Sequence, residues 1–570
     1  MKILGYEIAL SEEELDDIIN NKTRHIKLID KNFPGYQNLT EGNKKALEHL
    51  VAAAKYFNTV AEEQDHELNL TLQKGLEEAS LTSSHAAKAL RLFNMFRGVE
   101  GHNGVDLNPI EIFKGVKAAK GRNFYPSDLT VEEFHQIIKR MIEQGQDKEV
   151  QKILSVRTIV RRDKENLKAI DYTEYFANIF SEVANELEVA AHYTTDEDFK
   201  DFLGWQAQAL LQNNEDMDML ADKHWAVLQN NNQLEFTIGR ESYDDKMTPT
   251  IYDNSELLQM LEERGIEVNS KDMLGARVGI VNKEGTNLIL QFKAHIPEIA
   301  KLMPLNDKYT QNVTADGELK QTMVDADIAA LAGDYAQCRG GITLAQNLPN
   351  NDKLAIKTGG GRRNVYHRQI RQAEDKERLK KLLDRLVAPE FHQYYDGEMD
   401  HLFVIGHENG HSLGPDNTYQ RSLGNYKSTI EEHKADMVSI TFMPEYVKAN
   451  VISEEMLKKI YTTWVVKRLF LKAQPVEVHR VAELIHFNYL LERGAFSFDA
   501  EHKVHIHFEK FHQVAYDLLE DTIALQLSKS PEKAKTFIDR YTKWGEHSQY
   551  IAKIQQELGI KNYIEIISYI

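Results

Sequence analysis

The sequence predicts a mostly α-helical fold with a small β portion, of the α+β class, and three observations lead to this prediction. Apolar residues recur at helical spacing through most of residues 10–230. Short runs typical of strands replace this pattern between about residues 234 and 281, and helical patterns return after about residue 375. With 42% hydrophobic and 28% charged residues among 570, the chain has the composition of a folded globular protein.

The first 230 residues predict a helical scaffold. Ala46, Leu47, Leu50, Ala54 and Phe57 would share one helix face, because they lie three or four residues apart or next to each other. Further along, Thr130 precedes Glu133 by three residues and an apolar helical pattern follows, as in a capping box. The segments 172–192 and 199–211 show the same helical spacing. We therefore expect nearly all of this region to be helical.

The middle of the chain predicts a small mixed sheet. Residues 235–238 and 276–281 are typical of short strands, and residues 255–264 predict a helix that ends at Gly265. The apolar pattern of residues 286–302 suits either a helix or a strand. The run Asn347-Leu348-Pro349-Asn350 is either a plain turn or an extended polar segment that could hydrogen-bond a peptide main chain.

The segment His407-Glu408-Asn409-Gly410-His411 carries the clearest chemical signal. On a helix, residues four apart lie one above the other, so both imidazoles could bind one metal ion with Glu408 beside them. The apolar run 402–406 leads directly into His407, which predicts a largely buried helix. The alternative is a solvated helix face. Against it, the polar side chains of a buried His-Glu-x-x-His need a partner.

A catalytic zinc site needs a third protein ligand, and Glu432 is the natural candidate. It follows His411 by 21 residues, which leaves room for a turn and a second helix packed on the first. Asp436 lies one helical turn further and could accept the free N–H of a ligating histidine. We therefore predict one Zn²⁺ per chain on His407, His411 and Glu432, with Glu408 as the general base.

Charge and cysteine content limit the partners. The 69 basic residues against 88 acidic ones give a net charge of −19, which argues against nucleic acid. No apolar run approaches the ~20 residues of a membrane span, and the early acidic residues argue against a signal peptide. Because the only cysteine, Cys338, cannot form an intrachain disulfide, we expect a cytoplasmic protein. No obligate protein partner is evident.

Four motifs resemble those of the dipeptidyl peptidase III family of zinc metallopeptidases. Residues 431–436 match its Glu-Glu-x-Arg/Lys-Ala-Glu/Asp motif throughout, with Glu431 and Asp436 expected behind the metal ligands. Glu241-Ser242-Tyr243 is similar to the family's Glu-Ser-Tyr segment, and residues 347–350 to its Asn-x-Pro-Asn segment. His479 is similar to the family histidine that contacts the reacting amide.

The resemblance implies how these residues act on a short peptide. Glu241 would hold the free amino group of the substrate, and Asn347 and Asn350 would help to anchor its N-terminus. Tyr243 and His479 would stabilise the oxyanion that forms at the scissile carbonyl. The implied reaction is the release of dipeptides from the N-terminus of short peptides.

The resemblance also implies two lobes separated by a cleft, a helical zinc lobe and a lobe with a small β-barrel and helices. We expect residues 1–285 to form a helical scaffold and part of the β-containing lobe, and residues 286–330 part of the zinc lobe. Residues 331–375 would return to the β-containing lobe, and residues 376–570 would form the zinc-binding catalytic lobe.

Two departures from the family pattern leave alternatives open. Most members have HExxGH where this chain has the pentapeptide, as in some bacterial relatives, and Glu483 stands where the family usually has arginine. Both bear on rate and substrate preference. A thermolysin-like zinc endopeptidase also fits the zinc motif alone, and a non-catalytic peptide-binding protein could keep the fold, although the presence of Glu408 argues against the latter.

Overall fold

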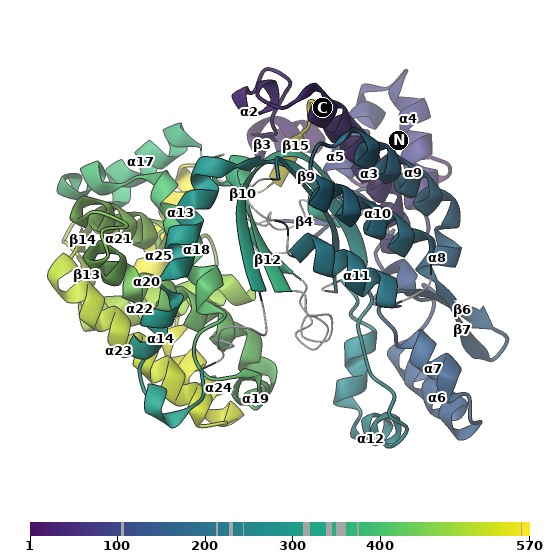
Figure 1. Ribbon diagram of the computed structural model, residues 1–570. Coiled ribbons are helices and arrows are strands. Elements are labelled where there is room, and N and C mark those ends of the chain that lie inside the picture. Colours follow the sequence, from purple (N-terminus) through teal and green to yellow (C-terminus); the bar gives the residue numbers. More distant parts are fainter. Residues whose placement is uncertain are drawn as a thin grey trace. The chain divides into compact units, whose positions relative to one another are not determined.

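The computed structural model describes residues 1–103, 108–212, 215–226, 228, 232–242, 244–311, 320–337, 345–348, 361–372, 375–559, 561 and 563–570. The chain divides into two compact units, and Figure 1 shows its helices and strands. Unit 1 comprises Met1–Val281, Ala326–Thr343 and Lys561–Ile570, and unit 2 comprises Asn282–Asp325 and Leu344–Ile560. The boundaries expected from the sequence were residues 285, 330 and 375. The two divisions differ most over residues 344–375 and over the last ten residues.

The predicted α+β class, mostly helical with small sheets, is confirmed. The helices of unit 1 are α1 (Glu12–Asp16), α2 (Pro34–Gln37), α3 (Glu41–Asp65), α4 (Asn69–Ser80), α5 (Ser84–Phe96), α6 (Val131–Glu143), α7 (Asp147–Ile153), α8 (Tyr172–Tyr175), α9 (Ala177–Tyr193), α10 (Glu197–Leu211), α11 (Glu215–Ala226) and α12 (Ser255–Glu263). Those of unit 2 are α13 (Lys283–Ala294), α14 (Ile296–Leu302), α16 (Arg368–Gln372), α17 (Lys376–Leu386), α18 (Asp400–Gly410), α19 (Asn417–Arg421), α20 (Lys427–Lys448), α21 (Glu454–Arg468), α22 (Val478–Arg493), α23 (Phe508–Leu527), α24 (Pro531–Tyr541) and α25 (Glu546–Glu557).

The long helices of unit 1 follow the apolar pattern of the sequence. The five α3 residues that were expected to share a face are all buried, and α3 packs against α9, which packs against α10. The first turn of α6 is capped as predicted, because the Thr130 hydroxyl accepts a hydrogen bond from the backbone N–H of Glu133. The helix expected over residues 255–264 is α12, and Gly265 follows it with a φ of +67°.

The expectation of a nearly all-helical N-terminal region is wrong at several short strands. The clearest is the hairpin of β6 (Thr158–Asp163) and β7 (Asn166–Asp171), which turns through Lys164 at a φ of +56°. Residue pairs such as Ile159 and Ile170 face each other across it. The other short strands within residues 10–230 are β3 (Thr23–Lys27), β4 (Glu100–His102) and β5 (Pro109–Glu111), while β1 (Lys2–Ile3) and β2 (Tyr6–Glu7) precede that region. Strands of two to six residues show too few alternations to stand out beside a helical pattern.

The largest sheet has five strands in the order β11-β12-β10-β9-β8. Its strands are β8 (Leu234–Glu241), β9 (Met273–Asn282), β10 (Lys320–Gly333), β11 (Ala345–Leu348) and β12 (Gly361–His367). The two predicted strands lie within β8 and β9, which pair antiparallel with Ile238 opposite Ala276. The ambiguous residues 286–302 form α13 and α14, which meet at His295. Smaller pairs are β13 (Phe496–Phe498) with β14 (Val504–Ile506), and β15 (Tyr563–Ile567) with β3.

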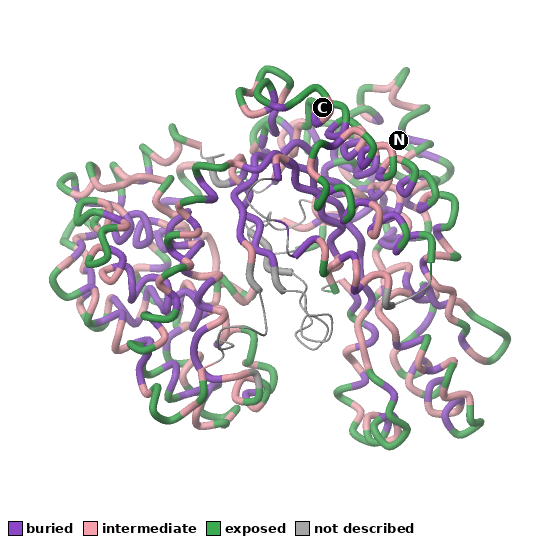
Figure 2. Tube along the Cα trace, in the orientation of Figure 1, coloured by how far each residue is buried: buried purple, intermediate pink, exposed green. Residues whose placement is uncertain are grey.

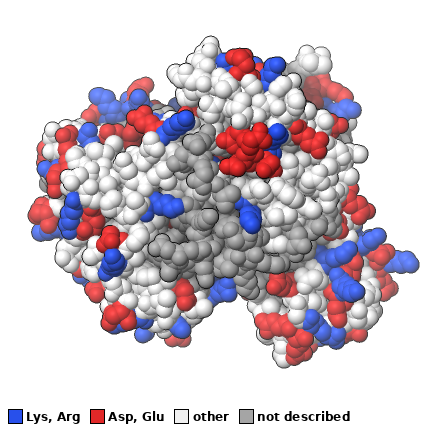
Figure 3. Space-filling view, in the orientation of Figure 1, with Lys and Arg blue, Asp and Glu red and all other residues white. Residues whose placement is uncertain are grey.

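Unit 2 is built around α20, whose buried residues run along most of its length. Helix α20 packs against α18, α22 and α23, and α18 also packs against α21. Figure 2 shows how the buried stretches of these helices gather inside the unit. Along the described parts of the chain, no helix is long and apolar enough to cross a membrane. In the view of Figure 3, basic and acidic side chains are interspersed.

Candidate metal centre

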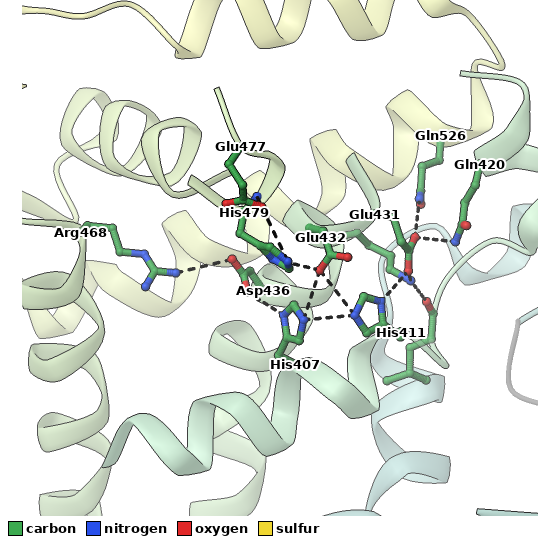
Figure 4. A network of polar contacts seen from close by, with 12 residues as sticks. His407, His411, Gln420, Glu431, Glu432, Asp436, Arg468, Glu477, His479 and Gln526 are labelled. Carbon is green, nitrogen blue, oxygen red and sulfur yellow. Dashed lines mark hydrogen bonds and ion pairs between the residues drawn. The ribbon is translucent and has the colours of Figure 1, made fainter. Parts of the chain in front are cut away.

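His407 and His411 lie one turn apart at the C-terminal end of α18. The helix ends at Gly410, but His411 keeps helical dihedral angles, with φ −61° and ψ −28°, as its cap residue. The two rings therefore face the same side, with centroids 4.7 Å apart and planes at 85°. Their Nε2 atoms are 3.1 Å from each other (Figure 4). The pair predicted from the four-residue spacing is thus formed.

Glu432, near the start of α20, completes the cluster. Its Oε2 lies 3.3 Å from Nε2 of His407 and 3.6 Å from Nε2 of His411. Burial acts to raise the pKa of Glu432, but His411 and His407 outweigh it and lower the pKa to about 2. Oε2 of Glu432 is buried and forms no hydrogen bond with any of the described residues, and its contacts with the histidines are ion pairs.

The three ligand atoms fit a tetrahedral metal ion. They all lie within 4.8 Å of one another, which would allow one ion to touch all three. Zinc–ligand bonds of ~2.0–2.2 Å at tetrahedral angles place ligand atoms roughly 3.3–3.6 Å apart. The measured separations of 3.1, 3.3 and 3.6 Å are close to this range. A cation between them would also satisfy the buried oxygen of Glu432, so the donor set suits zinc.

Two glycines of α18 allow α20 to approach closely enough to bring the ligands together. A Cβ at Gly410 would lie 2.8 Å from the carbonyl oxygen of Ala435 and 3.0 Å from its Cα, and one at Gly406 would clash with the Ser439 side chain. The Ser439 hydroxyl also donates a hydrogen bond of 2.7 Å to the carbonyl oxygen of Phe403. Because small residues let two helix backbones come into contact, the Gly-x-x-x-Gly spacing sets the distance between the histidines and Glu432.

A carboxylate lies behind each histidine. Nδ1 of His407 is 2.7 Å from Oδ1 of Asp436, and Nδ1 of His411 is 3.1 Å from Oε1 of Glu431 (Figure 4). The contact of Asp436 with His407 is of the kind that the sequence predicted for a ligating histidine. The contact of Glu431 with His411 places the second carboxylate behind the other ligand. Burial acts to lower the pKa of His407, but the hydrogen bond to Asp436 and the negative charges of Asp436 and Glu432 raise it well above its usual value. With each Nδ1 facing a carboxylate, each Nε2 remains directed at the cluster.

His479 lies beside the same cluster, in the first turn of α22. Glu477 caps this helix by accepting hydrogen bonds from the backbone N–H groups of His479 and Arg480, at 3.1 and 3.2 Å. Nδ1 of His479 is 3.4 Å from Oε2 of Glu432, and the side chain is 56% exposed. One turn further, Glu483 forms an ion pair of 2.7 Å with Arg480. His479 is therefore next to the metal ligands and open to solvent.

The other residues expected at the site belong to different elements. Glu408 is half-buried on α18 between the two histidines. Glu241 is the last residue of β8 and pairs with Met273, and Asn347 pairs with Asn364 in the register of β11 and β12. Tyr243 and Asn350 lie outside the described residues.

Sequence reasoning gave no role to four residues that pack against the helices or carboxylates of the cluster, namely Gly406, Gly410, Lys434 and Arg468. Gly406 and Gly410 carried a recognisable signal in their four-residue spacing, and Lys434 was part of the Glu-Glu-x-Lys motif. Arg468 carried none, because it follows Asp436 by 32 residues and reaches it only through the packing of α21.

Comparison with known proteins connects this site to a known fold. No family model matches the chain. The chain is 21% identical over 560 residues to Nudix hydrolase 3 of Arabidopsis thaliana, covering 88% of this chain and 68% of that protein.

Two solved structures match nearly the whole chain. The structure of DPP III from Caldithrix abyssi aligns with a TM-score of 0.79 and 26% identity, covering 97% of this chain and 98% of that one. The structure of dipeptidyl-peptidase III from Corallococcus sp. strain EGB aligns with a TM-score of 0.78 and 20% identity, covering 98% and 97%. Together with the division into two units, these matches show that the chain has the fold of the dipeptidyl peptidase III family.

Proposed function

We propose that this protein is a zinc-dependent exopeptidase that releases dipeptides from the free N-terminus of short peptides. The observation that carries the proposal is the cluster of His407, His411 and Glu432, whose ligand atoms lie within 4.8 Å of one another. The fold shared with two dipeptidyl peptidase III structures supports a peptidase of that kind. Three of the four sequence motifs lie outside the cluster and also support it.

One zinc ion per chain would be held by Nε2 of His407, Nε2 of His411 and Oε2 of Glu432. Bound Zn²⁺ supplies Lewis-acid activation of water and of the peptide carbonyl. Asp436 and Glu431 would keep the proton of each ligand histidine on Nδ1, so that each Nε2 offers its lone pair. All three ligand residues are partly exposed, as a site that admits a substrate requires.

Glu408 would transfer the protons of the reaction. Its carboxylate takes a proton from the attacking water and then delivers it to the amine of the leaving peptide. Glu408 directly follows His407 on α18, is half-buried, and is not one of the three ligands, as this role requires. His479, 3.4 Å from Glu432 and largely exposed, would donate a hydrogen bond to the oxyanion. We assign the second oxyanion donor to Tyr243 from its motif.

Release of dipeptides requires a group that binds the free N-terminus two residues before the scissile bond. We assign this role to the carboxylate of Glu241, which can pair with an ammonium ion, and to the side-chain amides of Asn347 and Asn350. The assignment rests on the similarity of residues 241–243 and 347–350 to the family's segments.

A short peptide with a free N-terminus tests the proposal. With the zinc-loaded protein, mass spectrometry should detect the N-terminal dipeptide as the first product, and the N-acetylated peptide should be cleaved far more slowly. Equal cleavage of both peptides would contradict the proposal, and internal fragments would favour a thermolysin-like endopeptidase. Binding of the peptide without cleavage at full zinc content would favour a non-catalytic peptide-binding protein.

Glu241→Gln tests the assigned N-terminal subsite. Loss of the carboxylate should lower kcat/KM for the free peptide by about 10-fold or more, because a charge-assisted hydrogen bond contributes about 1.5–3 kcal/mol. Glu256→Gln is the matched control in the same unit, since Glu256 on α12 is 71% exposed and forms an ion pair with Lys139 of α6. Similar kcat/KM values for the two variants would remove Glu241 from the subsite.

A further inference from the structure

Each carboxylate behind a ligand histidine has its own buried cation. Nζ of Lys434 lies 2.8 Å from Oε1 of Glu431, the oxygen that faces His411. Nη2 of Arg468 lies 3.7 Å from Oδ2 of Asp436, whose other oxygen faces His407 (Figure 4). Lys434 is 0% exposed and Arg468 is 3% exposed. The same arrangement thus occurs twice: a buried cation contacts a carboxylate, and that carboxylate contacts a ligand histidine.

Arg468 is fixed in place by its surroundings. It is the last residue of α21, and its guanidinium carbon lies 3.8 Å from the centre of the Trp464 ring and 5.3 Å from that of Phe403. Its Nη2 is also 3.4 Å from Nδ1 of the fully buried His486. Contact with both rings leaves the guanidinium little freedom, so its charge stays next to Asp436.

Lys434 connects α20 to the turn that follows His411. Its Nζ donates a hydrogen bond of 2.6 Å to the carbonyl oxygen of Leu413, two residues after the ligand. The second oxygen of Glu431 accepts hydrogen bonds from the side-chain amides of Gln420 and Gln526. Both oxygens of the Glu431 carboxylate are thus bound by neighbouring side chains. Lys434 lies on α20 and is also bound to the turn that follows α18.

The charges explain why such cations are needed. Glu431, Glu432 and Asp436 bring three negative charges into a buried region, which is costly unless they are compensated. Lys434 and Arg468 offset two of them, so of these three carboxylates only Glu432 keeps an uncompensated negative charge. A divalent ion bound there then keeps a net positive charge and stays electrophilic. Three uncompensated carboxylates would more than cancel the charge of the ion.

We propose that Lys434 and Arg468 are positioning residues of the metal centre. Through Glu431 and Asp436 they keep His411 and His407 oriented with Nε2 toward the ion, and they offset the charge of those two carboxylates. This inference rests on the proposed zinc site and deepens it, because it assigns the metal's affinity and geometry to two residues that do not touch the ion.

The variants Lys434→Met and Arg468→Met remove each cation while retaining a long side chain. Each should weaken zinc binding by about 10-fold or more, the range found when groups behind metal ligands are changed. Zinc affinity is measured by competition with a chelator, and the absorption spectrum of the cobalt-substituted protein reports ligand geometry independently of activity. Both the affinity and the spectrum should change in the methionine variants. Lys434→Arg and Arg468→Lys should recover part of the affinity.

A matched control separates this role from general stability. Lys271 in unit 1 is also 0% exposed, and its Nζ contacts the oxygens of Ile153, Ser155 and Thr158 instead of a carboxylate behind a histidine. Lys271→Met should lower the free energy of unfolding but leave zinc affinity and the cobalt spectrum unchanged.

A double variant tests whether Arg468 acts through Asp436. If it does, adding Arg468→Met to Asp436→Asn should weaken zinc binding little beyond the loss caused by Asp436→Asn alone. The sum of the two separate losses would contradict an action through Asp436.

Two results would overturn the inference by itself. One is a pair of soluble methionine variants that bind zinc as tightly as the wild type and give its cobalt spectrum. The other result applies if the methionine variants fail to fold. It is an Arg468→Ala protein with wild-type zinc affinity and cobalt spectrum, together with equal zinc affinities for Lys434→Arg and Lys434→Gln. A wild-type protein that binds no zinc would instead overturn the proposed function, so the two failures are distinguishable.

Discussion

At the scale of single residues, the metal cluster depends on which nitrogen of each imidazole is free. Asp436 and Glu431 occupy Nδ1 of His407 and His411, so only the Nε2 atoms face Glu432. A glutamine or asparagine at either carboxylate would keep the shape but weaken the preference for the tautomer with the proton on Nδ1. The orientation of the ligands therefore depends on side chains that do not touch the ion as well as on the three that would.

Glu408→Gln tests the proton transfer assigned to the one acidic side chain between the histidines. The variant should lose about 10²–10⁴-fold in kcat, the range typical of a general acid or base. It should keep its zinc, because Glu408 is not a ligand. Enzyme assays and metal analysis on the same preparation measure both quantities.

Glu398→Gln is the control for that variant, because Glu398 is exposed and precedes α18 by only two residues. It should retain both activity and zinc. A Glu408→Gln protein with near wild-type kcat would exclude Glu408 as the general base, and one that also loses zinc would assign it a structural role.

The ligands could be predicted from the sequence because a helix converts spacing into direction. The four-residue period of a helix was enough to predict that His407 and His411 share a face. The same period relates Glu432 and Asp436 on α20. Arg468 could not be predicted, since nothing in a one-dimensional pattern indicates that α21 packs beside α18. A residue that reaches the site only through tertiary packing is not marked by any local sequence pattern.

At the scale of elements, the contact between α18 and α20 decides whether the ligands meet. Gly406 and Gly410 face Ser439 and Ala435 at distances that leave no room for a Cβ. The metal site is thus built on two helices pressed together, and a change that separates them would move the histidines away from Glu432 without altering any ligand.

Gly410→Ala tests this contact. Overpacking against the backbone of Ala435 should cost about 1–3 kcal/mol of unfolding free energy and should weaken zinc binding as well. Gly204→Ala in α10 is the control, because no atom lies within 4 Å of a Cβ at that position. That variant should be stabilised by about 0.5–1 kcal/mol, from helix propensity, without a change in zinc affinity. Unchanged zinc affinity in Gly410→Ala would show that the site tolerates movement of α18.

Long helices were predictable as elements, whereas short strands were not. The apolar faces of α3 and α6 repeat over several turns, so their periodicity is distinct. The hairpin of β6 and β7 offers six residues a strand, and the ambiguous pattern of residues 286–302 was resolved only by its packing as α13 and α14. Local pattern fails where an element is too short to repeat it.

At the scale of the whole molecule, the two units are assembled from segments far apart in the sequence. The pairing of β3 with β15 brings residues 23–27 against residues 563–567, within unit 1. No composition change or linker marks the start of the last segment, so the sequence did not indicate that residues 561–570 belong with the first 281. The fold class was predictable from element types, but unit boundaries depend on long-range pairing.

All three proposed zinc ligands belong to unit 2, so zinc should stabilise that unit selectively. An ion that binds only the folded state adds about 4 kcal/mol at a thousandfold excess over its dissociation constant. Backbone amides of α18, α20 and the first turns of α22 should therefore exchange hydrogen more slowly in the zinc-loaded protein than after chelation. Mass spectrometry of peptic peptides measures this, with α9 and α10 of unit 1 as internal reference. Equal protection of both units would mean that they unfold together, and no protection of α18 and α20 would place the metal elsewhere.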